Sequence, residues 1–188
     1  MIGALVAASC ALSDLKPLKL EETASRVIEA RYPSLQNAEI AWHPFDDKFD
    51  FFRAQPRWRG THRFYLIEAN CALLKDPPSP AALEGVLAHE LGHLDDYTRR
   101  SAASLAWLGL KYSGPRSWTA RYERSIDEAA IDGGYGQGLK EYHLWLYRRL
   151  PPDLVALKKK LYYTPEEIDA RRDSRSQASS PKDRAKAP

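Results

Sequence analysis

The sequence is poor in cysteine, which limits the metal and redox chemistry open to it. It holds 2 cysteines among 188 residues. Cys10 and Cys71 lie far apart, so neither a zinc ribbon nor a CxxC redox pair can form. A disulfide between these two residues remains open. Histidine is also scarce, with 5 in the whole chain, so the spacing of the histidines carries information.

The chain also lacks a strong net charge and a long apolar run. The formal net charge is +3, and the excess comes from the tail after residue 168, where six basic residues outnumber three acidic ones. A neutral body with a short basic tail is poor evidence for nucleic-acid binding, so no nucleic-acid partner is expected. The longest later apolar run, at 102–110, is too short for a transmembrane helix of about 20 residues.

Residues 1–13, MIGALVAASCALS, form an apolar segment at the N-terminus. The segment is similar to the end of a secretory signal, or to a lipoprotein signal with Cys10 as the lipid acceptor. It has no basic n-region, and Ala7 stands three positions before the cysteine, where leucine is usual in lipoproteins. An ordinary apolar N-terminus is the alternative. The segment slightly favours the cell envelope or periplasm, or lipid anchoring, over the cytoplasm.

The remaining composition predicts a single globular domain. The chain is 44% hydrophobic and 28% charged, and its length allows a core without metal or disulfide support. We expect this domain over residues 14–168. Residues 169–188 hold almost no large apolar side chain, so they can bury too little surface to offset the entropy of ordering. They are predicted to form a disordered basic tail.

Hydrophobic periodicity predicts an α+β fold dominated by helices, with a small sheet. A first helix ends before Pro33. The segments AEIAWHPF (38–45) and RFYLIEAN (63–70) predict strands, with an irregular hairpin arm between them. A long helix is expected from Pro80, after Ser79 as its N-cap, to about residue 112.

The second half of the chain predicts further helices interrupted by glycine and proline. The segment SGPRS (113–117) breaks the pattern, and a helix from about Thr119 loosens over GGYGQG (133–138) before it resumes. That spacing differs from a phosphate-binding loop, so we expect close helix packing or a kink there. Thr164 and Glu167 predict a capping box for the last helix.

The segment LEGVLAHELGHLDDY (83–97) combines helical apolar spacing with the pattern H-E-x-x-H. His89 and His93 would lie about 6 Å apart along one helix face, so both imidazoles could bind one metal ion. Glu90 would be rotated about 100° from the first histidine. It is therefore unsuited as a third ligand but suited to deprotonate a metal-bound water. The alternative is an ordinary packed helix whose histidines bind nothing.

A catalytic zinc site requires a third protein ligand. Arginine at position 99 excludes the H-E-x-x-H-x-x-G-x-x-H pattern, which leaves a downstream carboxylate as the better candidate. Two E-x-x-x-D pairs overlap there, Glu123 with Asp127 and Glu128 with Asp132. Each pair offers one ligand and one partner that could hydrogen-bond a ligating histidine.

H-E-x-x-H followed by E-x-x-x-D resembles the glutamate-zincin (gluzincin) metallopeptidases, especially the CAAX-prenyl-type and heat-shock-type endopeptidases. The segment RYERSIDEAA (121–130) is similar to the R-x-x-E-x-x-A-D-x-x-A pattern of that group, with Ile126 in place of the usual alanine. A looser resemblance to uncharacterised soluble bacterial relatives covers residues 40–168. The resemblance favours Glu123 over Glu128 as the ligand, with Asp127 as its partner. The membrane spans of those endopeptidases are missing, so their substrates do not carry over.

The resemblance implies a zincin-like metallopeptidase domain with one Zn²⁺ per chain, held by His89, His93 and Glu123. Glu90 would be the general base that activates water for hydrolysis of a peptide or protein substrate. The small sheet would lie beside the helix that carries H-E-x-x-H. The alternatives are a zinc-binding envelope protein or pseudoenzyme that binds a partner without turnover, and hydrolysis of a non-peptide amide. The oligomeric state is not indicated.

Two further roles follow from the same resemblance. Candidates for the side chain that stabilises the oxyanion are His143, Tyr135 and Arg121, without a choice between them. A strand edge beside the H-E-x-x-H helix often binds substrate by β-addition. Residues 63–70 are the expected strand, unless they form an ordinary core strand.

Overall fold

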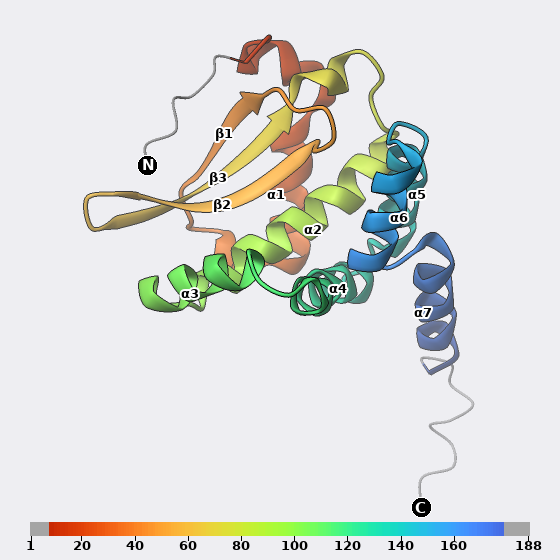
Figure 1. Cartoon of the computed structure of the whole chain (residues 1–188). Helices are drawn as coiled ribbons and strands as arrows, with labels where there is room; N and C mark the ends of the chain where they lie inside the picture. Colours follow the sequence, from red (N-terminus) through yellow and green to blue (C-terminus); the bar gives the residue numbers. More distant parts are fainter. Residues whose placement is uncertain (1–7, 179–188) are drawn as a thin grey trace, which may run out of the picture.

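The predicted class, α+β with a majority of helix, is confirmed by the computed structural model, which describes residues 8–178 (Figure 1). Within that range the strands are β1 (Ile40–Phe45), β2 (Phe52–Arg59) and β3 (His62–Asn70). The helices are α1 (Leu20–Arg31), α2 (Pro80–Thr98), α3 (Ala102–Tyr112), α4 (Arg116–Asp132), α5 (Gly136–Tyr147), α6 (Pro152–Leu161) and α7 (Pro165–Ala178). No helix in this part of the chain is long and apolar enough to cross a membrane.

The sheet has the order β1-β3-β2, with β3 parallel to β1 and antiparallel to β2. The segment predicted as an irregular hairpin arm is instead a regular strand, because β2 pairs with β3 residue by residue from Phe52 to Arg59. Pro56 is tolerated in β2 because an edge strand leaves one side unpaired. Gly60, with φ of 62°, supplies the left-handed turn that returns the chain into β3.

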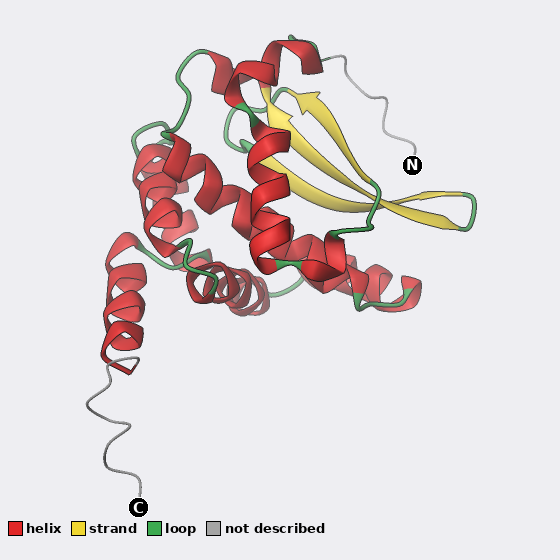
Figure 2. Cartoon of the chain, turned by 180° about the vertical axis from the view of Figure 1, so that it is seen from behind, coloured by secondary structure: helices red, strands yellow, loops and turns green. Residues whose placement is uncertain are grey.

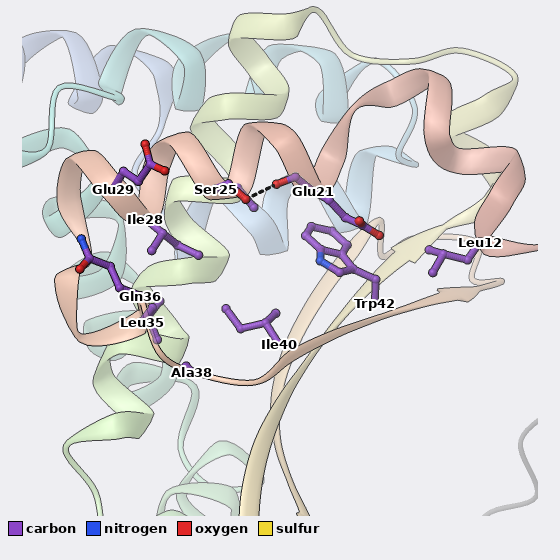
Figure 3. A pocket seen from close by; sticks show the side chains of 11 residues that line it. Leu12, Glu21, Ser25, Ile28, Glu29, Leu35, Gln36, Ala38, Ile40 and Trp42 are labelled. Carbon is purple, nitrogen blue, oxygen red and sulfur yellow. Dashed lines mark hydrogen bonds between the residues drawn. The ribbon is translucent and has the colours of Figure 1, made fainter.

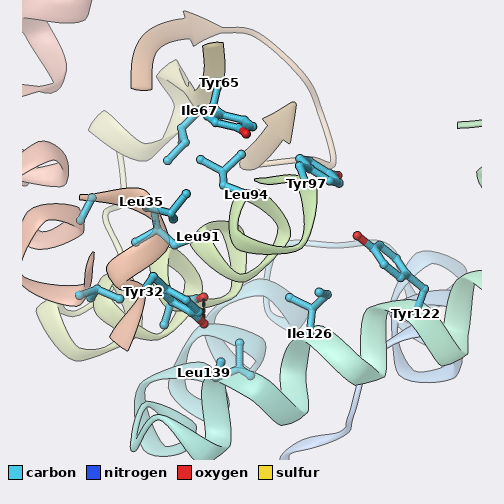
Figure 4. Close-up of a cluster of buried hydrophobic side chains, with 14 of the residues drawn as sticks. Tyr32, Leu35, Tyr65, Ile67, Leu91, Leu94, Tyr97, Tyr122, Ile126 and Leu139 are labelled. Carbon is cyan, nitrogen blue, oxygen red and sulfur yellow. Dashed lines mark hydrogen bonds between the residues drawn. The ribbon is translucent and has the colours of Figure 1, made fainter. Parts of the chain in front are cut away.

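Helix α2 runs through the middle of the protein, while α1 covers one face of the sheet (Figure 2). Thirteen of the 19 residues of α2 are buried, so this helix is enclosed on most sides rather than along one stripe. Leu91 and Leu94 of α2 pack with Ile67 of β3 in a cluster that Figure 4 shows beside Ile126 of α4. Any side chain on the inner turns of α2 is therefore held in a fixed, largely dry environment.

The long helix expected from Pro80 begins there, with the Ser79 hydroxyl accepting from the Ala82 N–H at 3.1 Å. It ends at Thr98 instead of continuing to residue 112. The Arg63 guanidinium of β3 donates to the carbonyl oxygens of Thr98 and Arg100, at 3.2 and 2.6 Å. A cation that satisfies free carbonyl groups stabilises a helix C-terminus.

Backbone contact between α2 and α5 explains two of the glycines. A Cβ atom added to Gly138 would overlap the carbonyl oxygen of Ala81, and one added to Gly85 would overlap the backbone of Leu139. The close packing predicted for the glycine-rich segment is confirmed. The segment also separates two helices, since α4 ends at Asp132 and α5 begins four residues later.

The predicted capping box is present, with the Thr164 N–H donating to Glu167 Oε2 at 2.8 Å and the Glu167 N–H donating to Thr164 Oγ1 at 3.2 Å. The disorder predicted from residue 169 is wrong for residues 169–178, which continue α7. Arg171 Nε donates to Glu128 Oε2 at 2.7 Å, and Arg175 binds the other oxygen at 2.5 Å. Charge pairing with α4 thus orders a segment with little apolar surface. Residues 179–188 lie outside the described part.

The two cysteines form a disulfide, which answers the question that the sequence left open. Cys10 and Cys71 are joined with their Cα atoms 5.7 Å apart, and the bond closes a separation of 61 residues. When Cys10 forms this disulfide, it has no free thiol that could accept a lipid. The part of the N-terminal prediction that concerns residues 1–7 lies outside the described residues.

Candidate metal centre

The H-E-x-x-H pattern lies on the buried middle of α2. His89, Glu90 and His93 are all buried, because the helix is covered by the sheet on one side and by α4 and α5 on others. The Nε2 atoms of the two histidines are 3.1 Å apart. Spacing by four residues has therefore brought both imidazoles to one point, as expected for successive turns of one helix face.

Helix α4 brings Glu123 to the same point. Its Oε2 atom lies 3.3 Å from His89 Nε2 and 3.3 Å from His93 Nε2. Ligand atoms about 2.0–2.1 Å from a tetrahedral zinc are about 3.3–3.4 Å apart. The triangle formed by these three atoms therefore has the size that a tetrahedral zinc requires.

The ligand triangle contains an atom that needs a positive charge. Glu123 Oε2 is buried and has no hydrogen-bond partner among the described residues. A buried carboxylate oxygen without a donor is costly to a folded protein. A divalent cation bound between the three ligand atoms would remove that cost, so the residues present fit a metal ion.

Two hydrogen bonds fix the orientation of His89 and Glu123. His89 Nδ1 lies 2.8 Å from Asp127 Oδ1, and Asp127 is fully buried. The other oxygen of Asp127 accepts from the Tyr163 N–H at 2.8 Å. A proton on Nδ1 then directs the free electron pair of Nε2 towards the site. The second carboxylate oxygen of Glu123 accepts a hydrogen bond from the Tyr112 hydroxyl.

His93 has a weaker positioning contact on α4. Its Nδ1 atom is 3.5 Å from the Tyr122 hydroxyl, which itself donates to Asp96 Oδ2 at 2.8 Å. The Tyr122 ring stacks on Trp118, with ring centres 5.4 Å apart. The aromatic pair therefore holds the hydroxyl beside the imidazole, although 3.5 Å is long for a hydrogen bond.

Burial and mutual charge shift the pKa values of the buried groups. Burial raises the pKa of Glu90, and the nearby His89 and His93 oppose this rise only in part. Burial would also raise the pKa of Glu123, but the two nearby histidines lower it well below its ordinary value. For His89, the nearby carboxylates of Asp127 and Glu123 outweigh burial and raise the pKa. Metal binding must therefore release a proton from this site.

A cavity of about 460 Å³ opens onto the three H-E-x-x-H residues. Glu90 lines it beside the ligands, and Tyr112, Lys158 and Tyr162 form part of its wall. The sequence did not indicate these three residues. Tyr112 ends α3 and Tyr162 follows α6, and neither belongs to a recognisable motif. Their places in the site depend on helix packing that no local pattern records.

Glu128, the alternative third ligand, does not reach the histidines. Its carboxylate is about one-third exposed and pairs with Arg171 and Arg175 of α7. Asp132 also pairs with Arg175. Of the two E-x-x-x-D pairs, the structure thus brings Glu123 and Asp127 to the histidines and directs the other pair to α7.

The three oxyanion-donor candidates have different surroundings. His143 lies beside His89, Glu90 and Tyr162 in a recess that adjoins the cavity. Its Nδ1 atom is 2.9 Å from the Tyr163 carbonyl oxygen, which leaves Nε2 for other contacts. Tyr135 packs against the core cluster away from the cavity, and Arg121 is exposed on α4. His143 is the only one of the three that the fold places beside the histidine ligands.

The strand at 63–70, predicted as the substrate-binding edge, occupies the wrong position for that role. It lies within β3, which is the central strand and is hydrogen-bonded on both sides. The edge next to α2 is β2, whose residues 52–55 line the cavity. The prediction failed because Gln55 and Pro56 obscured the strand pattern of β2.

A hollow larger than this cavity lies away from the centre. It occupies about 760 Å³ between α1 and β1, as Figure 3 shows around Ile28, Ile40 and Trp42. None of the residues that line it is a histidine or contacts the ligand triangle. Size alone therefore does not identify the chemical site of this protein.

Two helices and one buried aspartate thus bring together the candidate metal ligands predicted from the sequence. His89, His93 and Glu123 form the one group of histidine, cysteine and acidic residues within residues 8–178 that could hold a metal ion. The gluzincin resemblance of the sequence stays a prediction. Comparison of the chain with protein-family models, with curated proteins and with solved structures finds no match.

Proposed function

We propose that this chain is a zinc-dependent hydrolase with a zincin-like site, and specifically a metalloendopeptidase. One observation carries the proposal: two imidazole Nε2 atoms and the Glu123 Oε2 atom converge at 3.1–3.3 Å beside Glu90 in an open cavity. A structural zinc site is closed by four protein ligands. Three ligands, a cavity and an adjacent carboxylate favour a site that works on a substrate.

Zinc bound by these ligands would supply Lewis acidity, which polarises a carbonyl group and acidifies water. Glu90 is the residue to which we assign the proton transfer. It takes a proton from the attacking water as the new carbon–oxygen bond forms. It then gives that proton to the amine nitrogen as the carbon–nitrogen bond breaks. Burial of Glu90 limits its contact with bulk solvent to the side that faces the cavity.

Tyr162 is the donor that we assign to the oxyanion, because the Nδ1 proton of neutral His143 is directed to the Tyr163 carbonyl oxygen and leaves His143 no second N–H to donate. The Tyr162 ring centre lies 5.7 Å from that of His89, and both Tyr162 and His143 border the recess next to Glu90. Burial raises the pKa of Tyr162, so its hydroxyl stays protonated and can donate. Donors held in place before the reaction stabilise developing negative charge without a reorganisation cost.

The substrate is best accommodated as an extended polypeptide along β2. Within the described residues β2 pairs only with β3, so its outer N–H and C=O groups are free at the cavity wall. A peptide that adds to this edge would gain main-chain hydrogen bonds and place its carbonyl group near the ligands. This geometry favours a peptide over a small amide.

The test combines metal content with hydrolysis of a quenched fluorescent peptide library. Wild-type protein is expected to hold one zinc per chain and to cleave peptides. Glu90→Gln should keep its zinc and lose about 10²- to 10⁴-fold in rate, because it removes only the proton acceptor. Asp132→Asn is the matched control and should keep both properties.

Two outcomes would contradict the proposal. Well-folded wild-type protein that takes up no zinc, even when zinc is supplied, would leave the two histidines as ordinary helix residues. Full zinc content without cleavage of any peptide, equal in wild type and Glu90→Gln, would favour a zinc-binding envelope protein or pseudoenzyme that acts by binding a partner.

A further inference from the structure

Two segments of the chain are rich in basic residues and contain no acidic ones. Residues 51–67 hold four arginines, and residues 97–122 hold four arginines and one lysine. Neither segment contains aspartate or glutamate. The whole chain is close to balance, with 28 basic and 25 acidic residues. Positive charge is therefore concentrated in the β2–β3 hairpin and in the stretch around α3.

The fold brings these two segments together. Arg63 of β3 donates to carbonyl oxygens at the junction of α2 and α3, at 2.6 and 3.2 Å. The hairpin tip and α3 project on the same side of the protein in both views (Figures 1 and 2). Trp58 is paired with Arg63 across the hairpin, and residues opposite each other point to the same face. Trp58 therefore lies on the hairpin face that points to the junction.

Helix α3 exposes large apolar side chains at this place. Trp107 is 59% exposed and Leu110 is 65% exposed, while Leu105 and Leu108 are buried against the protein. Trp58 is 45% exposed on the hairpin. These are the three most exposed large apolar side chains of the described residues. Trp107 and Leu110 lie three positions apart, so they share one face of α3, and an exposed apolar face of this kind indicates a docking site.

Basic residues precede, end and follow α3, and they are only partly neutralised. The Lys111 ammonium lies 5.7 Å from the Trp107 ring and 5.3 Å from the Trp118 ring. Arg99 pairs with an α2 carboxylate at 2.7 Å, but Lys111 and Arg116 form no ion pair within residues 8–178. The following residues together are called the aromatic–basic surface: Trp58, Arg99, Trp107, Leu110, Lys111 and Arg116.

We propose that the aromatic–basic surface docks the protein on an anionic phospholipid bilayer, with α3 lying in the interface. Tryptophan and leucine would enter the boundary between headgroups and acyl chains, while the cations meet the anionic lipids. A nucleic acid would satisfy the cations but leave Trp107 and Leu110 in water, so the apolar half of the surface favours the bilayer. This inference does not depend on the hydrolase proposal or on a bound metal.

Docking by this surface would also set the position of the metal centre. Tyr112 ends α3 and lines the cavity that holds the histidines. The cavity therefore opens beside the docked helix, within reach of polypeptide at the bilayer surface.

The experiment measures binding of the full chain to vesicles of phosphatidylcholine with and without phosphatidylglycerol, by co-sedimentation. Lys111→Gln with Arg116→Gln is expected to weaken binding to the anionic vesicles about 25-fold, because each cation near such a surface contributes about fivefold. Trp107→Ala with Leu110→Ala is expected to weaken it more than tenfold. Matched controls are Lys75→Gln with Lys160→Gln, and Leu74→Ala with Leu144→Ala, which change exposed residues elsewhere.

A second measurement uses a gentler change at the same place. Trp107→Phe keeps an apolar ring, so it should retain binding but lose much of the fluorescence quenching caused by brominated lipids. The proposal is overturned if phosphatidylglycerol gives no gain in binding, or if the α3 variants bind like their controls. It is also overturned if duplex DNA, and not the vesicles, binds in a manner that Lys111→Gln with Arg116→Gln abolishes.

Discussion

The substitution Asp127→Asn tests how the orientation of His89 affects zinc binding, without changing His89 itself. Asp127 is fully buried and joins two groups: His89 Nδ1 at 2.8 Å and the Tyr163 N–H at 2.8 Å. An asparagine of the same shape has one acceptor oxygen, so it cannot accept from both donors. Either the histidine loses the partner that keeps its proton on Nδ1, or the Tyr163 N–H is left without an acceptor.

The size of the effect follows from these contacts. Loss of the partner of a ligating histidine typically costs 10- to 100-fold in metal affinity, which corresponds to about 1.4–2.7 kcal/mol. The metal-free protein should also lose stability by about 1–3 kcal/mol, since a buried group is left unsatisfied. We therefore expect weaker zinc binding together with a lower melting temperature.

Competition with a chromogenic chelator measures the zinc affinity, and thermal unfolding with and without zinc measures the stability gained on binding. Asp132→Asn is the matched control, because it lies on the same helix but pairs with Arg175. Zinc binding by Asp127→Asn as tight as in wild type would refute the positioning role. A loss of stability with unchanged zinc affinity would assign Asp127 to the fold alone.

Four other changes test separate parts of the structure. Tyr112→Phe removes the hydroxyl that donates to Glu123, the proposed third zinc ligand. Zinc affinity measured by chelator competition should fall severalfold with little change in folding. Gly138→Ala should lower the free energy of unfolding in urea by about 1–3 kcal/mol or more, because its Cβ meets backbone. Gly109→Ala lies in open space on α3, so it should leave the free energy of unfolding unchanged or raise it by about 1 kcal/mol. Cys10→Ser breaks the disulfide that closes a loop of 61 residues, so it should lower the free energy of unfolding by about 4 kcal/mol. An unchanged free energy of unfolding would contradict the presence of the disulfide.

The sequence was informative wherever a function depends on local spacing. H-E-x-x-H predicts convergence because its four-residue interval matches the helical turn, and the Nε2 atoms of His89 and His93 do meet. The choice of Glu123 over Glu128 agrees with the geometry for a reason that spacing cannot supply. Arg171 and Arg175 of α7 pair with Glu128 and hold it away from the histidines.

The failures lie where distant segments decide the outcome. At the break between α2 and α3, the local Ser101 cap of α3 is joined by contacts from Arg63, more than 30 residues earlier in the chain. The order of segment 169–178 depends on acidic residues of α4, so composition alone misjudged it. Tyr112 and Tyr162 reach the site only through packing of α3 and α6. Local propensity cannot encode such contacts, because tertiary interactions override it.

The glycine contact between α2 and α5 has a mechanical consequence for the cavity. With no side chain between Gly138 and the backbone of α2, the two helices cannot slide past each other without overlap, and packed interiors resist such strain. The wall that carries the histidines is therefore stiff. At the opposite wall, one ion pair within residues 8–178 joins α6 to the loop before β2, between Lys158 Nζ and Asp50 Oδ1 at 3.2 Å. Widening of the cavity for a large substrate would begin at that ion pair.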